Sequence, residues 1–262
     1  MKRIVVGTVL ALGLVQMVHA DVTLKQTTGG KGMGISGTAS GVTYIKGNKM
    51  RSDVVMGGKT QTMIFDVDAQ ELYIFDSKKK EADVWDMATF GTEISKAVDL
   101  SDAKASLTAN GQTKQIAARS ATGYDMEISM QSAMGGSKDM TMTVKLSGPV
   151  WIVKKAPGSA DYARFYKAAV AKGWIFSDPR GAKAQPGQAK AMAEMYRQVA
   201  DIGGIPYEIN MQIKMSGSGP MAAILSKMGS MTMTTTVDSV EVGPLADDLF
   251  APPAGYKLNH KK

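Results

Sequence analysis

The sequence predicts one α+β domain organised around a large antiparallel β-sheet. Runs in which apolar and polar residues alternate are joined by short turns, which is typical of antiparallel strands with one buried face. Two segments with helical periodicity lie between such runs, and the strand pattern returns after them. Because strands from both ends of the chain can pair in one sheet, we expect a single domain over residues 21–257, followed by a short basic tail at 258–262.

The clearest strand pattern lies in the first third of the chain. Five alternating runs follow one another with turn-rich residues between them, at 42–46, 49–55, 63–67, 71–76 and 82–87. The turn pair Gly47-Asn48 separates the first two runs. Connections this short force neighbouring strands to be antiparallel, so we expect a β-meander over residues 40–87.

Further strands are expected later in the chain. They are predicted at 116–119, 124–130, 140–147, 150–153, 207–215 and 231–242. The glycine-rich segment 29–34 superficially resembles a phosphate-binding loop, but it lacks the Gly-Lys-Ser/Thr ending and no helical pattern follows it. We interpret it as a flexible or bulged segment near the first strand.

Three helices are predicted from apolar residues at helical spacing. A short helix is expected within 88–101, and two longer helices are expected over 161–172 and 188–202, each followed by glycine. The segment 177–187 between the longer helices is rich in proline and glycine, which indicates a loop.

The N-terminus has the features of an export signal. The positively charged Lys2-Arg3 precedes an apolar stretch over 4–18, and Val18-His19-Ala20 places small residues at the positions that precede a cleavage site. We therefore expect residues 1–20 to be removed after Ala20, which predicts a periplasmic protein. No later apolar run approaches the length of about 20 residues that a spanning helix needs, so we expect no transmembrane segment in the mature chain.

Composition argues against most catalytic chemistry. The 262 residues contain no cysteine, which excludes disulfides, thiolate metal sites and a thiol nucleophile. Of the two histidines, His19 leaves with the signal and His260 lies near the end of the chain. We therefore predict no catalytic residue, no metal site and no cofactor. The positive residues behind the net charge of +7 are scattered and not interleaved with aromatic residues, which argues against a nucleic-acid partner.

Methionine is the compositional outlier, with 20 residues. Pairs such as Met140-x-Met142 resemble thioether copper(I) sites, but most methionines fall on the apolar side of the strand or helix pattern, where they would fill a core. A methionine-lined concave sheet would also present a deformable surface to acyl chains or other hydrophobic ligands. The candidate ligand-lining residues of such a surface are Met126, Met130, Met140, Met142, Met211, Met215, Met231 and Met233.

Six segments form a series of motifs along the chain. They lie at 44–51, 63–66, 72–87, 112–124, 150–166 and 249–257. The last has the form F-x-x-P-x-G-Y and is the most specific. Together the motifs resemble a bacterial domain-of-unknown-function family that is similar to the outer-membrane lipoprotein-sorting (Lol-type) carrier proteins.

The resemblance implies a curved antiparallel sheet, or half-barrel, with helices packed on its concave face. In the lipoprotein carriers this cavity holds acyl chains, so a lipid or an acylated protein is the partner that the resemblance implies. A second interpretation is an envelope sensor whose sheet binds another envelope protein, and a third is copper(I) binding through methionine. All three describe a non-catalytic binding protein rather than an enzyme.

Overall fold

The computed structural model describes most of residues 21–261. The residues outside the description are 1–20, 33–34, 98–102, 135–136, 175, 177, 183–185, 219–221, 224, 226, 228 and 262. The predicted signal peptide therefore lies outside the described residues. Within the described part of the chain, no helix is both long enough and apolar enough to cross a membrane.

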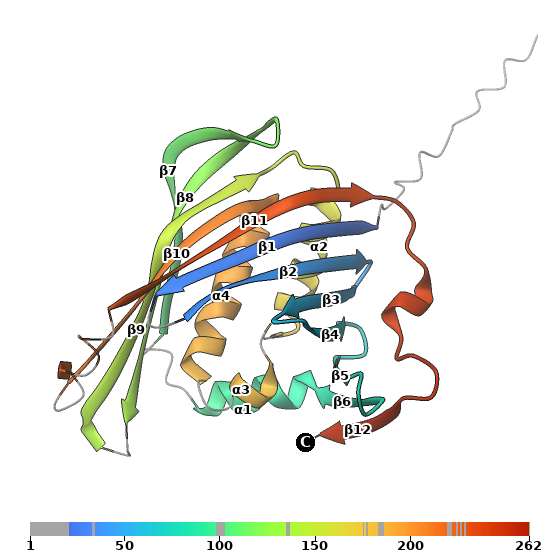
Figure 1. Ribbon diagram of the computed structural model, residues 1–262, viewed down its shortest axis with the longest axis horizontal. Helices are drawn as coiled ribbons and strands as arrows, with labels where there is room; N and C mark the ends of the chain where they lie inside the picture. Colours follow the sequence, from blue (N-terminus) through green and yellow to red (C-terminus); the bar gives the residue numbers. More distant parts are fainter. Residues whose placement is uncertain are drawn as a thin grey trace, which may run out of the picture.

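Twelve strands of the described chain form one curved sheet (Figure 1). They are β1 (Val22–Gly32), β2 (Ile35–Lys46), β3 (Lys49–Met56), β4 (Lys59–Asp66), β5 (Glu71–Asp76), β6 (Glu81–Asp86), β7 (Ala103–Ile116), β8 (Arg119–Met134), β9 (Ser137–Val153), β10 (Ile205–Gly217), β11 (Ser230–Val242) and β12 (Lys257–Lys261). Their order across the sheet is β12-β6-β5-β4-β3-β2-β1-β11-β10-β9-β8-β7. Strands β12 and β6 are parallel, and the other neighbours are antiparallel.

The helices lie along one face of this sheet. Those with described bounds are α1 (Met87–Ala97), α2 (Ser159–Ala171), α3 (Pro179–Ala182) and α4 (Pro186–Ile202), and a 3₁₀ turn, η2 (Asp247–Phe250), lies near the end of the described chain. Figure 1 shows α2 and α4 inside the curve of the sheet. Helices α1, α2 and α4 confirm the three predicted from helical spacing.

Pairing between the two ends of the chain makes the sheet continuous. Strands β1 to β6 follow one another across the sheet, which confirms the predicted meander. Strand β1 pairs with β2 on one side and with β11 on the other, so Val22 lies opposite both Ile45 and Val242. The fold is therefore the predicted α+β class: one open, curved, mostly antiparallel sheet with helices on its concave face.

Two clusters of buried side chains fill the space between the sheet and the helices. The first lies mainly between β1–β6, α1 and α2, and its fully buried members include Phe90, Phe165 and Trp174. The second lies between β7–β10 and α4 and contains Met126 and Ile128. Burying one large apolar side chain contributes about 1.5–3 kcal/mol. These clusters therefore hold α2 and α4 against the concave face.

The strand predicted at 116–119 is wrong, because these residues form a hairpin turn. Strand β7 ends at Ile116, β8 begins at Arg119, and these two residues pair across the turn. Ala117 and Ala118 have φ angles of 48° and 59°. Positive φ at both central residues is the requirement of a two-residue type I′ turn. Alanine carries no sequence signal for positive φ, so alternation alone predicts a strand here.

Both ends of the sheet-forming chain are more regular than expected. The glycines at 29–32 belong to β1, and Gly29 pairs with Thr234 on β11; residues 33–34 of the same segment lie outside the description. The irregularity in β1 falls instead between Lys25 and Gln26. At the other end, 257–261, which includes most of the predicted basic tail at 258–262, forms β12, because it pairs in register with β6.

Candidate functional site

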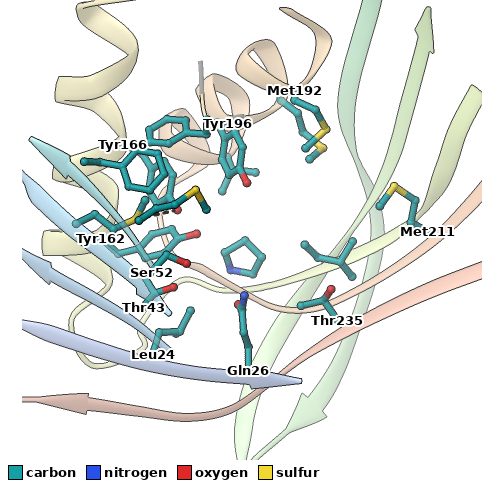
Figure 2. A pocket seen from close by; sticks show the side chains of 18 of the residues that line it. Leu24, Gln26, Thr43, Ser52, Tyr162, Tyr166, Met192, Tyr196, Met211 and Thr235 are labelled. Atoms are coloured by element: carbon teal, nitrogen blue, oxygen red, sulfur yellow. Dashed lines mark hydrogen bonds between the residues drawn. The ribbon is translucent and has the colours of Figure 1, made fainter. Parts of the chain in front are cut away.

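A pocket lies between the concave face of the sheet and helices α2 and α4, where the two buried clusters meet (Figure 2). Its lining includes Leu24, Met50 and Tyr166 from the first cluster, and Met195 and Met211 from the second. The cavity volume is about 310 Å³. The pocket is thus the space left where the two packed cores do not close on each other.

One side of the pocket is an aromatic wall, made of Phe65, Tyr162, Tyr166, Phe176 and Tyr196. Tyr162 and Tyr166 are one helical turn apart on α2, and their ring centroids are 4.6 Å apart. Tyr196 on α4 stacks on Tyr166 at 5.2 Å and lies 4.9 Å from Phe176. The wall therefore joins both helices to each other, and Phe65, 5.8 Å from Phe176, joins them to β4.

Another side of the pocket is lined by methionines from three elements. Met192 and Met195 lie three residues apart on α4, which places them on one helix face. Met211 on β10 lies directly opposite Met233 on β11 in the antiparallel register. Unbranched thioether side chains adapt to ligands of different shape. This methionine side is therefore the more deformable part of the lining.

The sheet contributes a polar floor, made of Gln26, Thr43 and Ser52 (Figure 2). Thr43 on β2 lies opposite Ser52 on β3, and Leu24 on β1 lies opposite Thr43. Gln26 is the next residue on β1 that faces the same side as Leu24. The three polar side chains thus come from adjacent strands and face the cavity together.

The lining of the pocket is electrically neutral. None of the described residues that line it is an aspartate, glutamate, lysine, arginine or histidine. Burial raises the pKa of Tyr162, Tyr166 and Tyr196, so these hydroxyls stay protonated well beyond neutral pH. The Tyr166 hydroxyl donates to the sulfur of Met50 at 3.8 Å. The site can therefore bind an apolar group, with hydrogen bonds but no ion pair.

The structure places four of the eight candidate methionines in packed or pocket-lining positions. Met211 and Met233 line the pocket. Met126 and Met130 do not, because they are buried within the second cluster between β7–β10 and α4. For these two, the strand alternation indicates the buried face correctly but cannot separate a filled core from a cavity.

The other four candidates lie elsewhere on the sheet. Met142, Met215 and Met231 are half-buried on β9, β10 and β11, outside the pocket lining. The side chain of Met140 lies outside the described residues. Within the part of the chain that the structure describes, no group of three or more histidine, aspartate or glutamate side chains could hold a metal ion.

Sequence reasoning missed the polar floor and most of the aromatic wall. Gln26, Thr43 and Ser52 each lie two positions from a buried apolar residue on the same strand, so all three face inward. The only indication of the pocket in the sequence is a polar residue at an inward-facing strand position. Such a residue does not identify a pocket, because the sequence of one strand does not show whether the space it faces is packed or hollow.

Neither a protein-family model nor a curated protein sequence matches the chain. Solved structures do match. An uncharacterized conserved protein from Thermus thermophilus has a TM-score of 0.40 at 9% identity, covering 93% of this chain and 92% of that one. A putative outer-membrane lipoprotein-sorting protein domain from Vibrio parahaemolyticus has a TM-score of 0.23 at 6% identity, covering 89% and 90%.

A further solved structure belongs to a family of unknown function. It is a DUF1329 family protein from Desulfovibrio piger, with a TM-score of 0.25 at 8% identity, covering 89% of this chain and 90% of that one. A lipoprotein-sorting domain and a protein from a family of unknown function are thus both among the solved structures that are similar to this chain.

Proposed function

We propose that this chain is a non-catalytic binding protein that holds a hydrophobic ligand in the pocket between the concave face of the sheet and helices α2 and α4. The observation that carries the proposal is the neutral, mainly apolar lining of a cavity of about 310 Å³. Small-molecule sites occupy about 300–1,000 Å³ and are lined mainly by apolar and aromatic side chains with a few polar groups. The volume suits one short chain or a small ring system.

The driving force for binding is removal of apolar surface from water. The aromatic wall and the methionine side present rings and thioethers to the cavity, and each 1 Å² of apolar surface buried contributes about 25 cal/mol. A charged ligand would lose its hydration without gaining a counter-charge, because no charged side chain lines the site in the described chain. The lining therefore selects for hydrophobic molecules.

We further propose that the protein acts in the periplasm after residues 1–20 are removed. Asp21, which would become the first residue, accepts hydrogen bonds from Gly243 N–H on its backbone oxygen at 3.1 Å and from Leu245 N–H on its carboxylate at 2.7 Å. Cleavage after Ala20 leaves both bonds intact, which supports the proposed cut. The mass of the exported protein tests it, since cleavage elsewhere gives a different mass.

Binding is tested by titrating the mature protein with a fluorescent apolar probe. Met233→Glu places a carboxylate in the pocket, and we expect it to weaken probe binding at least about tenfold, because an unpaired charge has to be desolvated. Met231→Glu is the matched control, since Met231 is on the same strand, two residues away and outside the lining, and its affinity should stay within about twofold of the wild type. Equal affinities for the two folded variants would contradict the proposal.

A further inference from the structure

We propose that the ligand carries an uncharged hydrogen-bonding group, such as an amide or a hydroxyl, which is held by the polar floor of the pocket. This inference rests on the proposed function and narrows it from hydrophobic ligands in general to neutral amphiphiles. It is carried by three polar side chains that face the cavity: Gln26, Thr43 and Ser52 (Figure 2).

The three side chains have no hydrogen-bond partner among the described residues. Thr235, which also lines the pocket, differs from them because its hydroxyl is 2.9 Å from that of Thr28. Polar groups withdrawn from water are nearly always paired, since leaving one unpaired costs free energy. Thr43 is only 8% exposed, and its hydroxyl is not among the fully buried unpaired atoms of the described chain, so it is reached through the pocket. The polar floor is therefore available to a ligand.

The chemistry of the floor matches a group that both donates and accepts. The Gln26 amide has two N–H donors and one carbonyl acceptor, and the hydroxyls of Thr43 and Ser52 can each do both. An amide or a hydroxyl on the ligand can accept a hydrogen bond from one of these side chains and donate a hydrogen bond to another. An ionised carboxylate or phosphate accepts only, and it would lie in a pocket without a described lysine or arginine. The pairing therefore favours an uncharged head.

The backbone beside Gln26 leaves room for its side chain. Gly41 lies opposite Gln26 in the β1–β2 register. A Cβ atom at Gly41 would be 3.3 Å from Cγ of Gln26 and 3.4 Å from its amide nitrogen, which is tighter than ordinary side-chain contact. Glycine at this position thus leaves the space over β2 that the Gln26 side chain occupies. Gly41→Ala should push the amide away from the floor without introducing a charge.

The test compares three ligands of equal chain length: decanamide, decanol and decanoate. Each ligand is titrated into the probe-bound mature protein, and displacement of the apolar probe is measured. The assay is run at about pH 8, where a carboxylic acid is ionised because its pKa is about 4. We expect decanamide and decanol to bind at least about tenfold more tightly than decanoate, because only the carboxylate has to bury an unpaired charge. Decanoate binding as tightly as decanamide would overturn the inference.

Variants assign the preference to the polar floor. Gln26→Met and Thr43→Val keep the side-chain size but remove hydrogen bonds, and each should weaken decanamide by about three- to tenfold, the value of one neutral hydrogen bond. Affinity for the apolar probe should be retained or should rise, because both substitutions replace a polar side chain of the lining with an apolar one. Gln115→Met makes the same glutamine-to-methionine change on the exposed part of β7, away from the pocket. This control variant should bind decanamide like the wild type.

The outcomes separate this inference from the proposed function. If the probe binds but Gln26→Met and Thr43→Val bind decanamide as the wild type does, the head-group inference is wrong and the hydrophobic site stands. If neither the probe nor any of the three ligands binds the folded wild type, both are wrong. Decanamide affinity lowered by about three- to tenfold in the two variants, with probe binding retained, supports both.

Discussion

The rings of Tyr166 on α2 and Tyr196 on α4 stack almost in parallel, with centroids 5.2 Å apart and planes inclined by 7°. This contact joins two helices that lie on the same concave face. Because both rings also line the pocket, the contact that holds the helices together is part of the binding site. Stability and ligand binding therefore share the aromatic wall.

Removing one ring of this stack should destabilise the protein. We expect Tyr196→Ala to lower the free energy of unfolding by about 2–4 kcal/mol, somewhat below the cost of truncating a fully buried aromatic residue, because Tyr196 is half-buried. Tyr196→Phe keeps the ring and should stay within about 1 kcal/mol of the wild type. Urea unfolding measures both. Equal losses in the two variants would show that the ring contact does not carry the effect.

Alkaline pH should weaken the fold through the same tyrosines. Burial raises the pKa of Tyr162, Tyr166 and Tyr196 above the ordinary value of 10.0. Above about pH 10 the unfolded chain releases these protons while the folded chain retains them, so the unfolded state binds fewer protons. Their stabilising contribution is thus fully present below about pH 10 and is lost as the pH rises further.

Urea unfolding measured at rising pH checks this expectation. Each of the three tyrosines should steepen the loss of stability by up to about 1.4 kcal/mol per pH unit above its unfolded pKa. Tyr196→Phe removes one such group, so its stability should decline less steeply than that of the wild type. An identical decline in both proteins would mean that Tyr196 ionises equally in the folded and unfolded states.

The β7–β8 hairpin offers a stabilising change. Ala117 and Ala118 both have positive φ, which costs roughly 1–2 kcal/mol for each residue with a Cβ atom. Replacing them with Asn-Gly, the preferred pair for a type I′ turn, should raise the free energy of unfolding by about 1–2 kcal/mol. Thermal unfolding measures the gain. A lower midpoint for the Asn-Gly variant would contradict the turn conformation.

Gly148 on β9 should tolerate no side chain. Its φ is 147°, and a Cβ atom there would overlap the backbone oxygen of Asn210 on β10. We expect Gly148→Ala to cost at least about 2 kcal/mol, since it combines backbone strain with a clash against main chain. Gly37→Ala on β2 is the control, because no atom lies within 4 Å of its Cβ position, and it should change stability by at most about 0.5 kcal/mol. Equal unfolding midpoints would contradict the close approach of β9 to β10.

Much of the fold follows from local pattern. Short turns such as Gly47-Asn48 force antiparallel neighbours, so the meander from β2 to β6 is predictable from sequence. Helical spacing likewise locates α2 and α4. Ala117-Ala118 and the parallel strand β12 are not predictable in this way, because the first depends on backbone strain and the second on pairing with a distant strand.

The site is less predictable than the fold. Alternation predicts that Met126 and Met211 both face inward, and both are buried. Only Met211 meets the cavity, since Met126 is packed within the second buried cluster and does not line the pocket. The polar floor is unpredictable for the same reason. Gln26, Thr43 and Ser52 can be identified as one polar group only once β1, β2 and β3 are known to be adjacent. Tertiary packing therefore decides which inward residues bind.

The central claim is that the pocket holds a small hydrophobic molecule, and native mass spectrometry of the gently purified mature protein tests it most directly. We expect the wild type to carry, or to take up from added decanamide, one ligand per chain. Met233→Glu should carry markedly less, and Met231→Glu should match the wild type. Ligand-free wild type that binds neither decanamide nor decanol would contradict the account.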